Sequence, residues 1–239
     1  MPNTKYGKRW SQLWTERGNA VRTVLGDTTP PQQVVPFHWR TPVLPGACAL
    51  TFGPTSSRPY WLYMTLGLTQ PRENSDCAVD WEFCVKTPSQ AHWAVQLLFD
   101  LTTYLLSVDC HVGRGLYLPL AFFRDPHGAI CAGLTSAAQS PELVAEGLIR
   151  GLYLWPDSDA FTFEVSSGAF GLMSAIGVTD DEDQLAQQAT PPHLLLLLKE
   201  ERIGQLMCAF RNSVLTDPDA RRRWNKIQQL SHTDILKKL

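Results

Sequence analysis

The chain has 239 residues, of which 44% are hydrophobic and 18% are charged. A chain this long and this apolar can bury a full core in one or two domains, and its composition argues against intrinsic disorder. The formal net charge of −2 gives no overall basic field, so non-specific nucleic-acid binding is not expected as its main role. We find no signal peptide and no run of about eighteen apolar residues, and the six cysteines are irregularly spaced. These features predict a cytoplasmic protein with reduced thiols and no membrane span.

The N-terminal part of the chain contains one helix pattern followed by short strand patterns. Apolar side chains at helical spacing predict an amphipathic helix over residues 1–18. Proline and glycine indicate a loop over residues 27–36, and short strands are expected over residues 33–39 and 48–53.

A strand pair and a long helix are predicted next. Residues 60–69 are apolar and aromatic, which predicts a buried strand. From Val79 to Lys86 apolar and polar residues alternate, so the apolar and the charged side chains should lie on opposite faces of a second strand. The polar connection between the two strands favours an antiparallel pair. Thr87 as the N-cap and Gln90 as its capping-box partner predict a helix over residues 88–107, apolar enough to be buried on more than one side.

The second half of the chain mixes strand and helix patterns. Strands are expected over residues 116–123, 129–134, 161–165, 170–178 and 203–210. Helices are expected at residues 141–144, after the N-cap Thr179, over residues 194–198 and after Asp217. Strands grouped with inserted helices favour an α+β fold with mostly antiparallel, mixed sheets flanked by helices.

Patterns that would carry catalysis or bind a metal are weak. Cys110-His111 is an adjacent Cys–His pair, but a catalytic dyad needs spatial closeness and an oxyanion hole, so a buried thiol beside a loop histidine is the simpler interpretation. Cys77 and Cys84 do not have a zinc-site spacing, the six histidines are scattered, and no phosphate-binding loop is present. We therefore expect no catalytic residue, no metal and no cofactor.

Two charged clusters are candidates for partner binding. The acidic run consists of Asp180, Asp181, Glu182 and Asp183. Such a run either complements the dipole at the start of a helix or steers a basic protein partner onto the surface. The basic run Arg221–Arg223 is simplest to interpret as the polar face of a terminal helix, and we expect no nucleic-acid partner.

Several pieces of the sequence, taken in order, resemble suppressor-of-fused proteins. Residues 59–69 are similar to that family's aromatic strand, which ends in a Gly-Leu-Ser/Thr step, here Gly67-Leu68-Thr69. Residues 81–86 resemble the next strand, and residues 88–119 resemble the long helix and the segment after it. Residues 170–188, with an acidic helix start and a Gln pair, resemble a further strand and helix of the family.

The resemblance implies one suppressor-of-fused-like α+β domain over residues 1–215, followed by a helical tail over residues 216–239, and no enzymatic activity. Animal members of the family hold a transcription-factor peptide, whereas many bacterial members resemble immunity proteins encoded beside secreted polymorphic toxins. This chain lacks the long C-terminal extension of the animal form and is similar to the short bacterial type. The expected function is therefore toxin neutralisation by direct binding of a cognate toxin. The alternatives are a scaffold for an endogenous protein or peptide, and a hydrolase with Cys110 as its nucleophile.

One partner-contact position of the family falls on Tyr63, four residues before Gly67. The family also uses an acidic residue after the Gly-Leu step, but this sequence reads Thr69-Gln70-Pro71-Arg72 there, which argues against the animal mode of peptide binding. Tyr63 and the acidic run at residues 180–183 are thus the candidate partner-binding residues.

Overall fold

The computed structural model describes residues 5–25, 30–37, 46–69, 81–107, 112–120, 149–158, 162–166 and 168–239. The strands are β1 (Gln33–Pro36), β2 (Cys48–Phe52), β3 (Trp61–Leu66), β4 (Trp81–Thr87), β5 (Leu116–Pro119), β6 (Gly151–Pro156), β7 (Thr162–Val165) and β8 (Gly168–Val178). The helices are α1 (Lys5–Val24), α2 (Trp93–Ser107), α3 (Asp180–Gln188), α4 (Pro191–Glu200), α5 (Pro218–Ile227) and α6 (His232–Lys238). The predicted α+β class is confirmed. Within the described residues, no helix has the length and apolar content needed to cross a membrane.

The strands form one mixed sheet in the order β1-β2-β3-β4-β8-β6-β5, with β7 also paired to β8. All the pairings are antiparallel except the one between β4 and β8. The antiparallel strand pair predicted from the sequence is confirmed: it consists of β3 and β4, with Trp61 opposite Thr87. The long strand β8 pairs with β4, β6 and β7 and so connects the two halves of the sheet.

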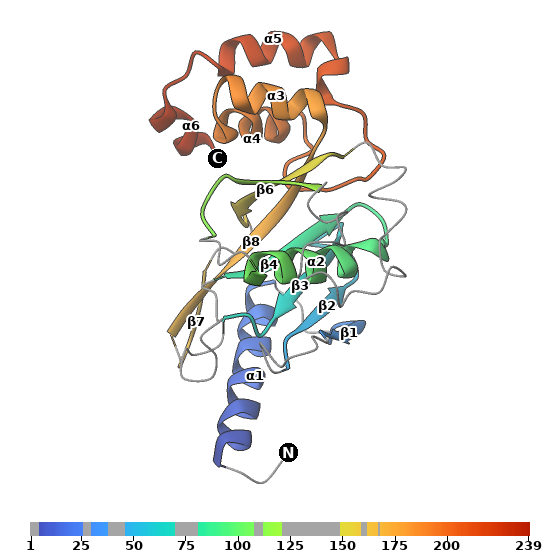
Figure 1. The fold of residues 1–239 in the computed structure, drawn as a ribbon, viewed down its shortest axis with the longest axis vertical. Helices are drawn as coiled ribbons and strands as arrows, with labels where there is room; N and C mark the ends of the chain where they lie inside the picture. The colour runs from blue at the N-terminus through green and yellow to red at the C-terminus, as the bar shows by residue number, and fades with distance from the viewer. Residues whose placement is uncertain are drawn as a thin grey trace.

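Helices cover both faces of the sheet (Figure 1). Alternate residues of β8 belong to different cores: Met173 and Ala175 pack under α2, whereas Phe170 and Leu172 pack in the core that contains Val21 of α1. Farther along β8, Ile176 and Val178 pack in the core of the C-terminal helices α3 to α6. One face of the sheet is therefore covered by α2, and the other by α1 at one end and α3–α6 at the other.

Both faces of β4 are buried, although its sequence alternates between apolar and charged residues. Its residues alternate as expected, but the charged face is also buried: Glu82 is 0% and Lys86 is 4% exposed. As predicted, α2 is buried on more than one side: every side chain from Trp93 to Leu106 is buried or half-buried. The predicted start of this helix is wrong, because Thr87 is the last residue of β4 and α2 begins at Trp93.

Other predicted boundaries also differ from the structure. The predicted first helix continues to Val24, and the strand β6 was not predicted. Residues 203–210 form turns with a single bridge from Leu206 to Lys86 in place of the predicted strand. The predicted C-terminal helix is divided into α5 and α6, which both pack on α4. The elements predicted at residues 129–134 and 141–144, and the pair Cys110-His111, lie outside the described residues.

Candidate functional site

The acidic run forms the first turn of α3, and Thr179 is the N-cap of that helix, as predicted. The Thr179 N–H donates a hydrogen bond to Glu182 Oε2 at 3.0 Å, and the Thr179 hydroxyl donates to Asp181 Oδ1 at 2.6 Å. Carboxylates in this turn satisfy free backbone donors and complement the helix dipole. The local sequence is thus sufficient to start the helix at this point.

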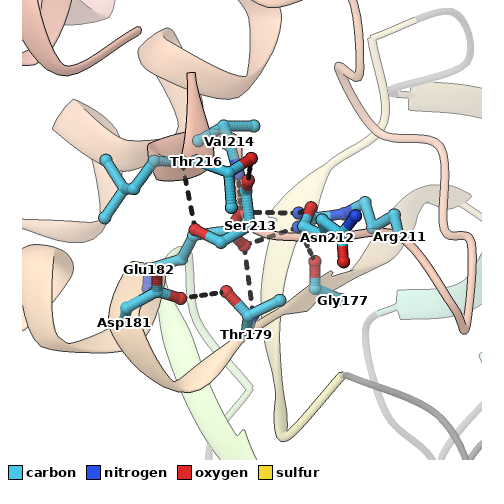
Figure 2. A network of polar contacts seen from close by, with 10 residues as sticks. Gly177, Thr179, Asp181, Glu182, Arg211, Asn212, Ser213, Val214 and Thr216 are labelled. Carbon is cyan, nitrogen blue, oxygen red and sulfur yellow. Dashed lines mark hydrogen bonds and ion pairs between the residues drawn. The ribbon is translucent and has the colours of Figure 1, made fainter. Parts of the chain in front are cut away.

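Glu182 is fully buried and anchors the segment that follows α4 (Figure 2). Arg211 donates to both of its carboxylate oxygens, at 2.5 and 2.6 Å, and the Val214 N–H donates to Oε1 at 2.9 Å. Arg211 also donates to the Gly177 carbonyl at 2.8 Å. A buried two-pronged ion pair of this kind fixes geometry, and removing one partner leaves an uncompensated charge. Glu182 is therefore not available to a partner protein in this conformation.

Asp183 is also turned into the protein. It accepts hydrogen bonds from the Tyr153 hydroxyl at 2.9 Å and from Gln187 Nε2 at 2.7 Å. Burial, together with the Asp183 carboxylate, raises the pKa of Tyr153 well above its ordinary value, so the phenol remains a hydrogen-bond donor. This contact joins α3 to the strand β6.

Asp180 and Asp181 form the exposed half of the acidic run. Arg150 Nε lies 3.8 Å from Asp180 Oδ2, a distance typical of a weak surface ion pair. Partial burial acts to raise the pKa of Asp181, but hydrogen bonds from Thr179 and Ser213 outweigh it and hold that pKa below its ordinary value. Asp181 is therefore a negative surface charge at neutral pH.

Phe210 is an exposed apolar side chain in the segment that follows α4. Its side chain is 54% exposed, and it immediately precedes Arg211, whose guanidinium is held by Glu182. An aromatic side chain beside charged groups on a rigid surface is typical of the anchors of protein interfaces. We call Asp180, Asp181 and Phe210 the α3 surface. No sequence pattern pointed to Phe210, because it lies in a segment that was predicted to be a strand.

Tyr63 lies in β3 and is 2% exposed. Its hydroxyl accepts a hydrogen bond from the Ala91 N–H at 2.7 Å, which ties the strand to the segment before α2. Burial raises the pKa of its phenol. The structure therefore does not bring Tyr63 together with the acidic run, and it places the side chain within the core under α2.

The Gly67-Leu68-Thr69 step, which carries much of the resemblance, wraps around the buried Glu82 carboxylate. All three backbone N–H groups donate to Glu82 Oε1, at 2.9, 3.0 and 3.1 Å. Arg17 of α1 lies 3.9 Å from the same oxygen and also donates to the Thr69 hydroxyl. The step thus docks α1 onto the sheet, which is a structural role.

The described residues hold neither a cluster of metal ligands nor an activated Cys84 thiol. In the parts of the chain that the structure describes, no three His, Cys, Asp or Glu side chains gather as a metal would require. Burial raises the pKa of Cys84 well above its ordinary value, which makes this thiol a poor nucleophile. Cys110, the nucleophile of the hydrolase alternative, lies outside the described residues.

No protein-family model and no curated protein matches the sequence. The fold is similar to the crystal structure of Drosophila Suppressor of Fused, with a TM-score of 0.62 and 13% identity over 89% of this chain and 53% of that chain. It is also similar to the crystal structure of the Sufu–Fu complex (TM-score 0.63, 13% identity, 91% of this chain and 97% of that chain). A third similar structure is that of a putative suppressor-of-fused homologue from Neisseria gonorrhoeae (TM-score 0.53, 14% identity, 82% and 92% of the two chains).

The chain spans about half the length of the Drosophila protein. At 13 to 14% identity this likeness establishes the fold. The suppressor-of-fused-like α+β fold expected from the order of the sequence pieces is thereby confirmed.

Proposed function

We propose that this chain is a non-enzymatic protein-binding module, and specifically an immunity protein that neutralises a cognate bacterial toxin by direct binding. The observation that carries the proposal is the α3 surface: Asp180 and Asp181 are exposed at the start of α3, and Phe210 is exposed next in sequence to Arg211, whose guanidinium binds Glu182 in the same turn. The fold supports it, because one of the similar structures is a complex of Sufu with the protein Fu.

The α3 surface combines long-range attraction with a short-range anchor. Two carboxylates attract a basic partner surface and raise its association rate, while a half-exposed aromatic ring gains affinity when a partner pocket buries it. Arg211 and Glu182 fix the segment that bears Phe210, so little conformational entropy is lost on binding. The surface suits a cationic protein such as a nuclease toxin.

The proposal is tested by looking for a toxin domain encoded next to this gene, co-expressing the chain with that domain, and measuring binding between the two. We expect protected growth and a tight complex. Phe210→Ala should weaken the complex by about 2 kcal/mol, roughly thirtyfold in Kd, mainly through faster dissociation. The double variant Asp180→Asn, Asp181→Asn should slow association about five- to tenfold at low salt and less at high salt.

Two exposed residues away from the α3 surface provide matched controls. Val34→Ala removes a side chain as exposed as that of Phe210, and Glu200→Gln neutralises an exposed acid on α4. Neither should change binding. Absence of both protection and binding would contradict toxin neutralisation, and a pull-down that recovers an endogenous protein instead would favour the scaffold function.

A further inference from the structure

The sheet divides into two halves partway along β4 and β8. The parallel pairing of these strands ends with Cys84 opposite Ser174. Beyond that point β4 continues beside β3 to Thr87, and β8 continues beside β6 to Val178. The segment that follows α4 contacts the diverging ends of both strands. We call its residues 205–211 the strap.

Met207 of the strap lies against both strands. Its N–H donates to the Lys86 carbonyl of β4 at 2.7 Å, next to the bridge between Leu206 and Lys86. A Cβ added to Gly177 of β8 would lie 3.0 Å from Met207 Cγ, so the methionine packs directly on this glycine. Met207 is 0% exposed and belongs to the core under α2. The strap therefore joins the two halves by a backbone hydrogen bond on one side and by apolar packing on the other.

Gln205 anchors the first end of the strap to both halves of the sheet. Its Nε2 donates to the Pro156 carbonyl of β6 at 2.9 Å, and its Oε1 accepts a hydrogen bond from Lys86 Nζ of β4 at 3.4 Å. The same ammonium lies 2.8 Å from Oδ2 of Asp157, which follows β6 directly, and both charges are almost fully buried. Gln205 thus binds beside an ion pair that itself connects the two halves.

Arg211 anchors the other end of the strap on β8 and α3 (Figure 2). Its guanidinium donates to the Gly177 carbonyl and to both carboxylate oxygens of Glu182. Between the two anchors, Ala209 is buried under α2, whereas Phe210 is 54% exposed. A segment held by two polar anchors and a short buried stretch opens at a lower free energy than the fold as a whole.

The turn between α4 and the strap contains an unfavourable backbone conformation. Arg202 has a φ of 60° and Gly204 a φ of 54°, both in the left-handed region that favours glycine. The Ile203 and Gly204 N–H groups both donate to the Leu198 carbonyl of α4, at 3.0 and 2.9 Å. Because Arg202 is not a glycine, the closed strap carries strain at this residue.

We infer that the strap opens and closes as one unit, from the turn at residues 202–204 to Arg211, and that the closed strap holds the two halves of the sheet together. Opening breaks the hydrogen bond to the Lys86 carbonyl and the contacts of Gln205, so the end of β4 loses protection in the same event. The closed strap also fixes the position of Phe210 on the α3 surface. Opening is a property of the free chain, and its test needs no partner protein.

The test is hydrogen exchange of the full chain, measured by mass spectrometry. Gln205→Ala should speed exchange about tenfold in the peptides that cover the strap and the end of β4, and leave α5 unchanged, because it removes one anchor. Gln229→Ala removes an exposed amide after α5 and is the matched control. Arg202→Gly should slow exchange in the same two peptides about threefold, whereas Arg202→Ala retains the strained φ and should not change it.

Three results would overturn the inference. Faster exchange of the strap alone in Gln205→Ala would show that the strap does not hold the end of β4. An equal increase in every peptide, α5 included, would show a general loss of stability in place of a local opening. If Gln205→Ala does not fold, the two Arg202 variants decide, and equal exchange in both would show that the strap does not open from this turn.

Discussion

At the residue scale, the buried charges of this chain hold distant segments together. Glu82, Asp157 and Glu182 are buried carboxylates, and each lies beside a basic side chain from another part of the chain. Replacing one partner of such a pair leaves a buried charge unpaired, which costs about 3–5 kcal/mol. Buried carboxylates are also common in active sites, but the contacts of these three residues give them a structural role.

Asp100 of α2 is a half-buried carboxyl that lies outside these ion pairs. Burial raises its pKa to about 7, and a hydrogen bond from Gln96, which lowers it, only partly offsets this. In the unfolded chain the pKa of this carboxyl is near its ordinary value of 3.8. Between pH 3.8 and about 7, therefore, the carboxyl is protonated in the folded state and ionised in the unfolded state. The contribution of Asp100 to the free energy of unfolding therefore falls as the pH rises from about 4 to 7, and it is constant above that.

We predict that Asp100→Asn raises the free energy of unfolding by about 1–3 kcal/mol at pH 8 and leaves it near the parent value at pH 4. The amide remains neutral and can still accept the hydrogen bond from Gln96. Urea unfolding across this pH range measures the effect, with the exposed Glu164→Gln as the control for loss of one charge. A constant difference between variant and parent at all pH values would contradict the raised pKa.

At the element scale, the docking of α1 depends on the turn that follows β3. Gly67 has a φ of 102°, in the left-handed region that favours glycine. A Cβ at this position would lie 2.7 Å from Trp14 Cζ2 of α1. The turn therefore needs glycine both for its backbone conformation and for the close approach of the helix.

We predict that Gly67→Ala lowers the free energy of unfolding by about 1–3 kcal/mol and loosens α1. Hydrogen exchange of the α1 amides should increase in this variant. Gly113→Ala is the control, because a Cβ there has no neighbouring atom within 4 Å, and it should change stability by less than about 0.5 kcal/mol. Unchanged exchange in α1 would show that Gly67 is not needed for its docking.

Elements with a strong periodic or capping signal were predictable from the sequence. Alternation marked β4, and Thr179 with its acids marked the start of α3, because both signals are local. The strand β6 was missed, since its residues Gly151–Pro156 are nearly all apolar or aromatic and show no alternation. Thr87 was assigned to a helix because capping chemistry does not reveal that β4 still pairs with β3 at that residue.

At the scale of the whole molecule, β8 contributes side chains to all three cores. Loss of packing in one core should therefore weaken the others, and the chain should unfold in one cooperative transition. The C-terminal helices should unfold in the same transition, because Ile235 of α6 is 0% exposed within the core that contains Ile176 and Val178 of β8.

We predict that Ile235→Ala lowers the free energy of unfolding by about 2–4 kcal/mol while circular dichroism and tryptophan fluorescence still report a single, coincident transition. The neighbouring Leu236 is 42% exposed, so Leu236→Ala should cost less than about 1 kcal/mol. An early transition confined to the C-terminal helices would instead identify residues 216–239 as a separate unit.

The sequence by itself determined the fold class, the antiparallel strand pair, the apolar helix after it and the capped start of α3, because each depends on local pattern. It also identified the acidic run, but only the tertiary structure divided it into a buried pair and an exposed pair. That division depends on Arg211 and Tyr153, which are distant in sequence and reach Glu182 and Asp183 only in the folded chain. Burial of Tyr63 and exposure of Phe210 were decided in the same way, because burial depends on which helices cover the sheet.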